Sequence, residues 1–373
     1  MKTKNQHYIP QSILVNFANN KGQLFEALVK QEKIYSTNYR QSMSERFTYE
    51  HPDLEVNLLE NAFGKIESYF APAMRKIISD LDSNSVSIDT IKMQADTFMK
   101  DYLVFYYRSG ALLNEYAFDG LNVSVKIPLM LEKIIDSKYL SNLSETIKSF
   151  YDFAIIKSEG CNFILSDQYV STAALSIKGQ YSNISNRHLG LKDVLMLIPL
   201  SSKYYIVYSN GNRPNFIAKN KVNLLSDEDV CRINKTIMSN SYVKCIGLHK
   251  SPLEKSIEYY NYESPSKTIV AYKSGVKTTA LNKKEVFFYE EDIEQWAFFK
   301  NFMHTINKNT RRNDTCRCGS GEKYKKCCLL RSERNYLIVE NMYKKDHLIK
   351  IKAHPTSYIE KALEEYSYFS NED

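Results

Sequence analysis

The chain has 373 residues, of which 43% are hydrophobic and 25% are charged, and its formal net charge is +7. These values are ordinary for a globular protein, and the length predicts two domains or one large domain with an appendage. The sequence has no GxGxxG, GxxxxGK[ST], GxSxG or HExxH motif, so it gives no support to the enzyme classes that these motifs mark.

Charge and hydropathy bear on the cellular location of the protein and on its possible partners. The mild positive charge is compatible with a nucleic-acid partner but does not require one. The N-terminus lacks a long apolar core, and no apolar run approaches the roughly 20 residues that span a bilayer. We therefore expect a cytoplasmic protein with no membrane partner. In a reducing compartment, clustered cysteines are expected to bind metal rather than form disulfides.

Helices dominate the predicted elements of the first half. Short apolar runs at residues 23–28 and 33–35 predict small strands or turns. Apolar residues at helical spacing predict a helix over about 54–81, which Pro72 should kink or divide. A second helix is expected to begin at a cap, Ser87 or Asp89, and to end near residue 116. A third should cover residues 128–150.

Strands become more frequent after residue 150. They are expected at 162–166, at 194–199 and 204–208 as a hairpin, and at 242–248, with a helix over 227–240. Helices first and strands later predict an α+β fold, in which a helix-rich N-terminal half packs with a mostly antiparallel sheet.

The sequence predicts that the C-terminal end forms a separate region. A helix over 291–306 should be followed by a polar, basic linker over 307–315, and two further helices are expected at 332–350 and 356–368. We therefore predict a domain over residues 1–306 and a small zinc knuckle with C-terminal helices over 307–373.

Four cysteines give the sharpest signal in the sequence. They are arranged as C-x-C, eight residues, then C-C, which lets two close pairs wrap four thiolates around one tetrahedral Zn²⁺ ion. Four thiolates close the metal's first shell, so the zinc should be structural. Gly319 and Gly321 allow the intervening turn to adopt left-handed backbone angles. The expected ligands are Cys316, Cys318, Cys327 and Cys328.

This segment resembles the SEC-C motif, a zinc-binding tail found at the ends of many unrelated bacterial proteins. Three phrases carry the resemblance: Arg312-Asn313-Asp314, Gly319-Ser320-Gly321 and Lys323-Tyr324-Lys325-Lys326. Thr315 and Arg317 stand where proline is common in the motif. The resemblance implies a bacterial protein and an adapter that contacts a protein partner or the ribosome.

Basic side chains surround the cysteines. A four-thiolate zinc centre is formally a dianion, so these cations either neutralise the metal site or form a surface that binds nucleic acid or another polyanionic partner. They are Arg311, Arg312, Arg317, Lys323, Lys325 and Lys326.

The beginning of the chain carries a second resemblance. Asn5-Gln6-His7-Tyr8-Ile9-Pro10-Gln11 is similar to the opening phrase of the family DUF4238, and the stretch from Asn57 to Glu67 resembles its paired-glutamate helix. Asn162 to Asp167 resembles a family phrase that ends in Ser-Asp and normally continues with Asn-Pro-Val. Gln168-Tyr169-Val170 replaces those three residues here. The resemblance spans most of residues 5–250 and implies no particular activity.

Polar residues in these phrases form a candidate catalytic set: His7, Glu60, Glu67, Arg108 and Asp167. Glu60 and Glu67 are seven residues apart, so on a helix they share one face to within about 20°. Carboxylates with one histidine suit general acid–base chemistry, or hydrolysis assisted by Mg²⁺ or Mn²⁺.

Each of these residues also has a structural alternative. His7 could pin the N-terminal segment, both glutamates could pair with Arg108 or Lys65, and Asp167 could cap the turn after its strand.

Two functions follow from the sequence. The first is a metal-assisted hydrolase, which we expect to be a nuclease of the defence or toxin type. The second is a non-enzymatic adapter that binds RNA, the ribosome or a protein through the zinc tail. Convergence of His7, Glu60, Glu67 and Asp167 in one cleft would favour the enzyme, and scattered positions would favour the adapter.

Overall fold

A computed structural model describes residues 3–109, 123–175, 189–190, 193–257, 266–273, 276–284, 286–292, 309–317 and 320–329. The chain divides into two compact units, residues 1–288 and 289–373, and each is considered by itself. The boundary that the sequence predicts, at 306/307, stays a prediction.

The N-terminal segment forms two pairs of strands around one helical turn. The first strand pairs antiparallel with the fourth, with Gln6 opposite Glu45, and the second pairs antiparallel with the third. Both strands predicted here are present. The elements are β1 (Asn5–His7), α1 (Gln11–Leu14), β2 (Gln23–Leu28), β3 (Lys33–Asn38) and β4 (Ser44–Arg46).

The helical region follows, and its longest member runs through Pro72 without a break. Pro72 is exposed, so water can satisfy the carbonyl group that the missing proline N–H leaves free. Ser87 caps the next helix by accepting a hydrogen bond from the Thr90 backbone N–H at 3.2 Å. The second and third predicted helices are each divided, at Phe98 and Asp136. The helices are α2 (Leu58–Ser83), α3 (Ile88–Thr97), α4 (Met99–Tyr107), α6 (Val123–Ile135) and α7 (Ser137–Phe150).

A five-stranded sheet forms the centre of the first unit. Its strand order is β10-β5-β9-β8-β7, and only the β10–β5 pair is parallel. The predicted hairpin is confirmed, since β8 and β9 are adjacent and antiparallel. The strands are β5 (Asp152–Lys157), β7 (Ser171–Ala174), β8 (Val194–Pro199), β9 (Tyr204–Asn210) and β10 (Val222–Leu224).

A second, antiparallel sheet has the order β3-β2-β11-β6. It joins the N-terminal strands to residues far along the chain, because β11 lies between β2 and β6. The remaining elements are β6 (Leu165–Ser166), α8 (Asp227–Ser239), β11 (Lys244–Gly247), α9 (Lys250–Ile257) and the β12–β13 hairpin (Ser266–Lys273 and Val276–Lys284).

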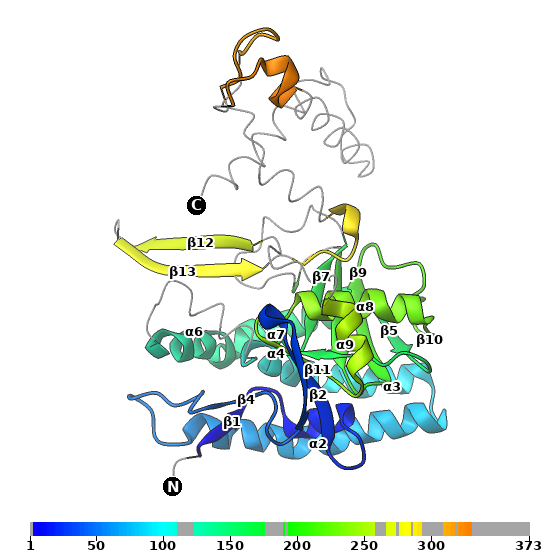
Figure 1. The fold of residues 1–373 in the computed structure, drawn as a ribbon. Helices are drawn as coiled ribbons and strands as arrows, with labels where there is room; N and C mark the ends of the chain where they lie inside the picture. Colours follow the sequence, from blue (N-terminus) through cyan, green and yellow to red (C-terminus); the bar gives the residue numbers. More distant parts are fainter. Residues whose placement is uncertain are drawn as a thin grey trace. The chain divides into compact units, whose positions relative to one another are not determined.

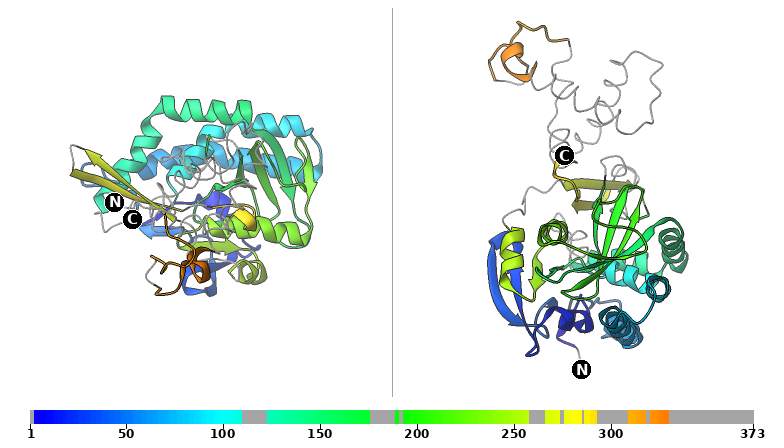
Figure 2. Two further views of the ribbon diagram at one scale, coloured as in Figure 1. Left: turned by 90° about the horizontal axis from the view of Figure 1, so that it is seen from above. Right: turned by 90° about the vertical axis from the view of Figure 1, so that its right-hand side faces the viewer.

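Helices cover both faces of the five-stranded sheet (Figures 1 and 2). On one side, the Tyr208 hydroxyl on β9 donates to Asp96 of α3 at 2.6 Å. On the other, Asn240, at the end of α8, exchanges hydrogen bonds with the backbone of Thr172 on β7 at 3.0 and 3.1 Å. Strands β8 and β9 are almost wholly buried between these layers.

These features confirm the predicted α+β class and its mostly antiparallel pairing. Among the described residues, no helix is both long and apolar enough to cross a membrane. The predicted helices over 291–306, 332–350 and 356–368 lie almost entirely outside the described residues.

Candidate functional site

Arg108 is a fully buried cation at the end of α4, only 1% exposed. Aromatic rings surround its guanidinium group: the Cζ atom lies 4.6 Å from the ring centre of Phe63, 4.9 Å from that of Phe105 and 5.9 Å from that of Tyr49. A buried charge is costly unless it is paired, and it is rarely placed among apolar groups without a partner.

The partner is Glu67 of α2. Its carboxylate accepts a hydrogen bond from the Arg108 Nη2 at 2.6 Å, and the glutamate side chain remains 29% exposed. The same Nη2 lies 3.5 Å from the backbone carbonyl oxygen of His7, at the end of β1. Arg108 therefore joins β1, α2 and α4, and the alternative in which a glutamate pairs with Arg108 applies to Glu67.

Two residues that the sequence analysis did not select hold Arg108 in place. The Tyr49 hydroxyl donates to the Arg108 backbone carbonyl at 3.0 Å, and the Tyr49 backbone N–H donates to the Gln6 side chain at 2.7 Å. The opening phrase of the chain thus reaches Arg108 through Tyr49. Gln6 and Tyr49 were missed because neither residue type is typical of a catalytic site and their pairing depends on the β1–β4 ladder.

Glu60 lies seven residues before Glu67 on α2 and is half-buried. Its carboxyl group has no hydrogen-bond or ion-pair partner among the residues that the structure describes. Burial raises the pKa of Glu60; the positive charge of Arg108 opposes that rise, while Glu67 and Glu50 add to it. Within the described part of the chain, Glu60 is therefore a half-buried carboxyl group whose pKa is raised and whose oxygens have no partner.

The pKa of His7 shifts in the opposite direction to that of Glu60. Burial lowers its pKa, against the hydrogen bond to the Arg40 carbonyl and the charge of Glu67, which raise it. The His7 Nε2 lies 3.1 Å from the Arg40 carbonyl oxygen, to which it donates, and the Gln11 amide lies 3.4 Å from Nδ1. This pattern fits a neutral imidazole whose Nδ1 lone pair is basic. It also shows that His7 does pin its segment.

We call His7, Glu60, Glu67 and Arg108 the Arg108 cluster. Its members come from three elements that are distant in sequence, and the charges of Glu67 and Arg108 act on both His7 and Glu60. Of the five predicted residues, Glu67 contacts Arg108 through its side chain and His7 contacts it through its backbone carbonyl oxygen, while Glu60 is related to them only by the charges that act on its pKa.

Asp167, the fifth, has a different set of contacts. Its carboxylate accepts from the backbone N–H groups of Tyr242, Val243 and Lys244 at 3.0, 2.8 and 3.1 Å, and from the Ser241 hydroxyl at 2.9 Å. Burial raises the pKa of Asp167, and these four donors act against the rise. The residue anchors the segment before β11, as a structural role would require.

The predicted ligands for Mg²⁺ or Mn²⁺ do not form a ready-made metal centre. Among the described residues, the one group of three histidine, cysteine or acidic side chains close enough to hold a metal ion is a set of cysteines. His7, Glu60 and Glu67 are not such a group. A divalent ion here would need further ligands from a substrate, as Mg²⁺ commonly has.

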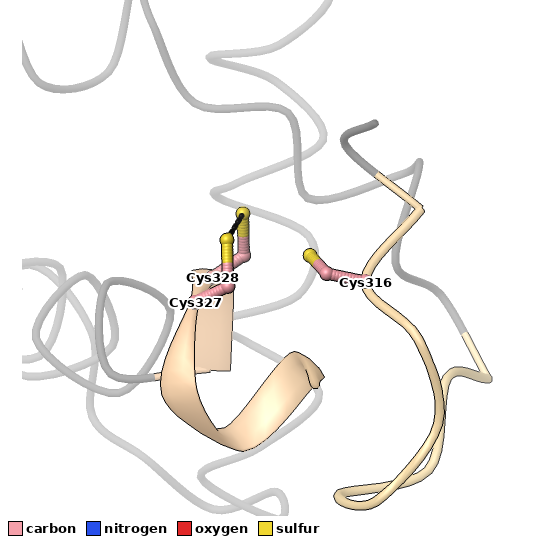
Figure 3. Close-up of side chains that lie close together, drawn as sticks. All are labelled: Cys316, Cys327 and Cys328. Atoms are coloured by element: carbon pink, nitrogen blue, oxygen red, sulfur yellow. Dashed lines mark hydrogen bonds between the residues drawn. The ribbon is translucent and has the colours of Figure 1, made fainter. Parts of the chain in front are cut away.

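The cysteine cluster lies in the second unit. The Sγ atoms of Cys316, Cys327 and Cys328 all lie within 4.8 Å of one another, and they face a shared space in Figure 3. The Cys327 and Cys328 sulfurs are 3.8 Å apart, the spacing expected of thiolates at about 2.3 Å from one tetrahedral ion. These cysteines form no disulfide. Cys318, the fourth predicted ligand, lies outside the described residues.

A short hairpin positions these thiols. Thr315 pairs antiparallel with Lys323 in an isolated bridge, and the Cys316 backbone N–H donates to the Glu322 carbonyl at 2.7 Å. Gly321 in the turn has φ +74°, where its missing Cβ avoids strain, as the sequence predicts. A 3₁₀ turn, η5 (Tyr324–Lys326), then leads into Cys327.

The basic side chains around the cysteines face the solvent. Arg311, Arg312, Arg317, Lys323 and Lys326 are exposed and Lys325 is half-buried. Only a few acidic residues lie nearby in sequence, such as Asp314, which accepts from the Arg311 backbone N–H at 2.9 Å. These contacts are compatible with both interpretations of the positive charge, neutralisation of a metal site and binding of a polyanion.

The fold and the two sites define an α+β protein with an acidic and basic cluster in its body and a separate cysteine cluster that could hold a metal. Comparison with known families gives the same division. Residues 5–251 match the family described as "Protein of unknown function (DUF4238)", and residues 312–330 match the SEC-C motif. The chain belongs to the DUF4238 family, and both predicted resemblances are confirmed. No curated protein and no solved structure matches the chain.

Proposed function

We propose that the Arg108 cluster is the catalytic site of a hydrolase that cleaves a phosphodiester, and that the protein is a nuclease of the defence or toxin type. One observation carries the proposal: a fully buried arginine pairs with Glu67 of α2 and lies 3.5 Å from the His7 backbone carbonyl oxygen at the end of β1, and its charge also acts on Glu60. Perturbed titratable groups around one buried charge are typical of functional sites, although structural networks also produce them.

The chemistry assigned to each residue follows from its surroundings. Glu60 has a raised pKa and no hydrogen-bond partner among the described residues, which suits a general acid for the leaving oxygen. His7 has a lowered pKa and a neutral ring, which suits a general base for the attacking water. The pKa of Glu60 is raised and that of His7 is lowered, and such opposite pKa shifts are what assign one group the role of acid and the other the role of base. Arg108 and Glu67 would position the phosphate and the base.

The metal requirement is a separate part of this proposal. Because His7, Glu60 and Glu67 are not a preformed three-ligand group, Mg²⁺ or Mn²⁺ would enter with the phosphate, held by one or two carboxylates. Chelation by EDTA, followed by addition of either ion, distinguishes assisted cleavage from acid–base cleavage alone.

The test uses purified protein with labelled RNA and DNA. Glu60→Gln and His7→Gln should each reduce cleavage by about 10²-fold or more. Glu145→Gln, in an exposed pair with Lys148, is the matched control and should cleave as the wild type does. Equal turnover in all four proteins would rule out the site.

We further propose that the cysteine cluster holds one structural Zn²⁺, with Cys318 as the fourth ligand. The thiolate spacing supports zinc, which soft sulfur ligands favour. Elemental analysis should find one zinc per chain in the wild type and much less in Cys316→Ser. A Cys231→Ser variant, altered in the body, should keep its zinc.

A second candidate function rests on the exposed basic residues beside the cysteines. They favour an adapter that binds RNA or the ribosome, or else a protein partner. Lys323→Gln with Lys326→Gln should weaken RNA binding and reduce the slope of its salt dependence by about one for each lysine that bonds to a phosphate. Lys250→Gln, in the body and paired with Glu254, is the control. Unchanged binding in the double variant contradicts this role for RNA.

A further inference from the structure

A group of buried polar side chains beside Arg108 has no hydrogen-bond partner in the part of the chain that the structure describes. Its members are the Arg108 Nε, the Ser109 hydroxyl, both side-chain amide atoms of Gln168 and the Tyr169 hydroxyl. None of these residues is more than 1% exposed. A buried polar group without a hydrogen-bond partner is costly, and native proteins contain few of them.

These residues, which we call the unpartnered set, belong to two short segments, 108–109 and 168–169, and one residue of each segment packs on the ring of Phe105. The Arg108 Cζ lies 4.9 Å from the ring centre of Phe105, and the Tyr169 ring centre lies 5.4 Å from it. Burial raises the pKa of Tyr169 well above its ordinary value, and the charge of Arg108 is among the influences that oppose the rise. Ser109 directly follows Arg108, and Gln168 directly precedes Tyr169.

The backbone holds Gln168 and Tyr169 in a strained turn. Tyr169 has φ +60°, a left-handed conformation that is unfavourable for a bulky side chain. The turn is fixed on its N-terminal side, where Asp167 accepts four hydrogen bonds from residues 241–244. A strained backbone that places two unsatisfied side chains in the interior is characteristic of a ligand site.

The chemistry of the set identifies the ligand class. Arg108, Ser109, Gln168 and Tyr169 can each donate, and the guanidinium group adds a positive charge that repels cations. Glu67 occupies Nη2, so the Nε–H remains for another acceptor. Charge-assisted bonds from arginine to a phosphate oxygen are among the strongest that such donors make.

We propose that Arg108, Ser109, Gln168 and Tyr169 form a buried binding site for a phosphoryl oxyanion. The site deepens the proposed nuclease function and rests on it for the source of the anion, a phosphodiester phosphate of a nucleic acid. Glu60 and His7 would then act on a phosphate that the unpartnered set holds.

The first experiment compares two buried tyrosines in phosphate-free buffer. The Tyr205 hydroxyl donates to the Ile164 carbonyl at 2.6 Å, so Tyr205→Phe should lower the melting temperature. Tyr169→Phe removes a hydroxyl without a partner, so the melting temperature should stay the same or rise by about 1 to 3 °C. A fall as large as that of Tyr205→Phe would show that the Tyr169 hydroxyl is already satisfied and would overturn the proposal.

The second experiment measures ligand stabilisation with inorganic phosphate and with a short single-stranded oligonucleotide, which separate a free phosphate from a phosphodiester. At equal ionic strength, phosphate should raise the melting temperature by at least about 2 °C more than chloride or acetate does. Tyr169→Phe and Gln168→Leu should lose at least half of that increment. An equal shift with all anions, or in both variants, would overturn the proposal.

Glu60→Gln separates this inference from the proposed function, since it removes the acid and leaves the unpartnered set intact. Phosphate should stabilise this variant as it does the wild type. A phosphate shift without nuclease activity in the wild type would reject the nuclease and keep the oxyanion site. Cleavage without a phosphate shift would reject the oxyanion site and keep the nuclease.

Discussion

The cysteine cluster and the Arg108 cluster differ in how far along the chain their residues are spread. Cys316, Cys327 and Cys328 belong to one short hairpin and one 3₁₀ turn. The Arg108 cluster instead joins the end of β1, one face of α2 and the end of α4. The first site needs only local geometry, whereas the second needs most of the body to be folded.

The two clusters also differ in how each would affect the folding free energy of its unit. In the second unit, a metal bound by the cysteine cluster would itself supply the free energy that folds the surrounding hairpin. In the body, the pairing of Arg108 with Glu67 offsets the cost of burying a cation, whereas Glu60 and several buried polar groups have no partner among the described residues and therefore oppose folding. The body thus carries costs that a purely structural core would avoid, and we propose that these costs mark its functional region.

Metal removal should produce the largest effect and tests the independence of the two units. Structural zinc contributes roughly 10 kcal/mol or more to the folding of small zinc modules. With a strong chelator, amide hydrogen exchange over residues 309–329 should become fast, while exchange in the five-stranded sheet stays slow. Simultaneous loss of protection in β8 and β9 would contradict the comparison.

Substitution of Arg108 should be the most damaging single change in the body. Arg108→Met removes the partner of Glu67 and the cation that packs on Phe63 and Phe105, so unfolding in urea should show a loss of about 3 kcal/mol. Arg232→Met, in an exposed pair with Glu228, should cost less than about 1 kcal/mol. Similar losses in the two variants would show that Arg108 has no special place in the core.

Asp167→Asn should rank next. The amide –NH₂ group would face backbone N–H donors that now bond to a carboxylate, so the free energy of unfolding should fall by about 2 kcal/mol. Asp53→Asn, at a position 87% exposed, is the control and should change it by less than about 0.5 kcal/mol. If Asp167→Asn lost cleavage yet kept full stability, the residue would belong to the catalytic site after all.

A pH series tests the smallest effect, the raised pKa of Glu60. The folded state holds the Glu60 proton more tightly than the unfolded chain, so this residue favours folding at low pH. Its contribution falls as pH rises from below the ordinary value of 4.5 through the raised folded-state pKa. Glu60→Gln cannot titrate there, so its stability relative to the wild type should be greater at pH 7 than at pH 4. A constant difference would mean that the pKa is not raised.

The sequence predicted local structure better than long-range pairing. The 194–199 and 204–208 hairpin, the helix over 227–240 and the cysteine spacing are all set by nearby residues. Strand β5 was not predicted, and the interruptions at Phe98 and Asp136 were missed because the apolar pattern continues across them. Such breaks depend on tertiary packing, which periodicity alone does not contain.

The candidate site shows the same limit. Helical spacing placed Glu60 and Glu67 on one face of α2, and Arg108 was a possible partner for both glutamates, of which it pairs with Glu67. The sequence could not show that the Asp167 carboxylate accepts hydrogen bonds from the backbone of residues 242–244, since those contacts depend on the β6–β11 pairing. Nor could it show that Gln168 and Tyr169 lie buried without hydrogen-bond partners within the described structure, because burial follows from the packing of α4 against their turn.

The pH–rate profile of nucleic-acid cleavage tests the central claim most directly. If neutral His7 is the base and protonated Glu60 the acid, kcat/KM should follow a bell-shaped curve, whose acidic limb disappears in His7→Gln and whose alkaline limb disappears in Glu60→Gln. Both variants should also be slower than wild type by about 10²-fold or more. Wild-type rates and an unchanged profile in both variants would contradict a catalytic role for the Arg108 cluster.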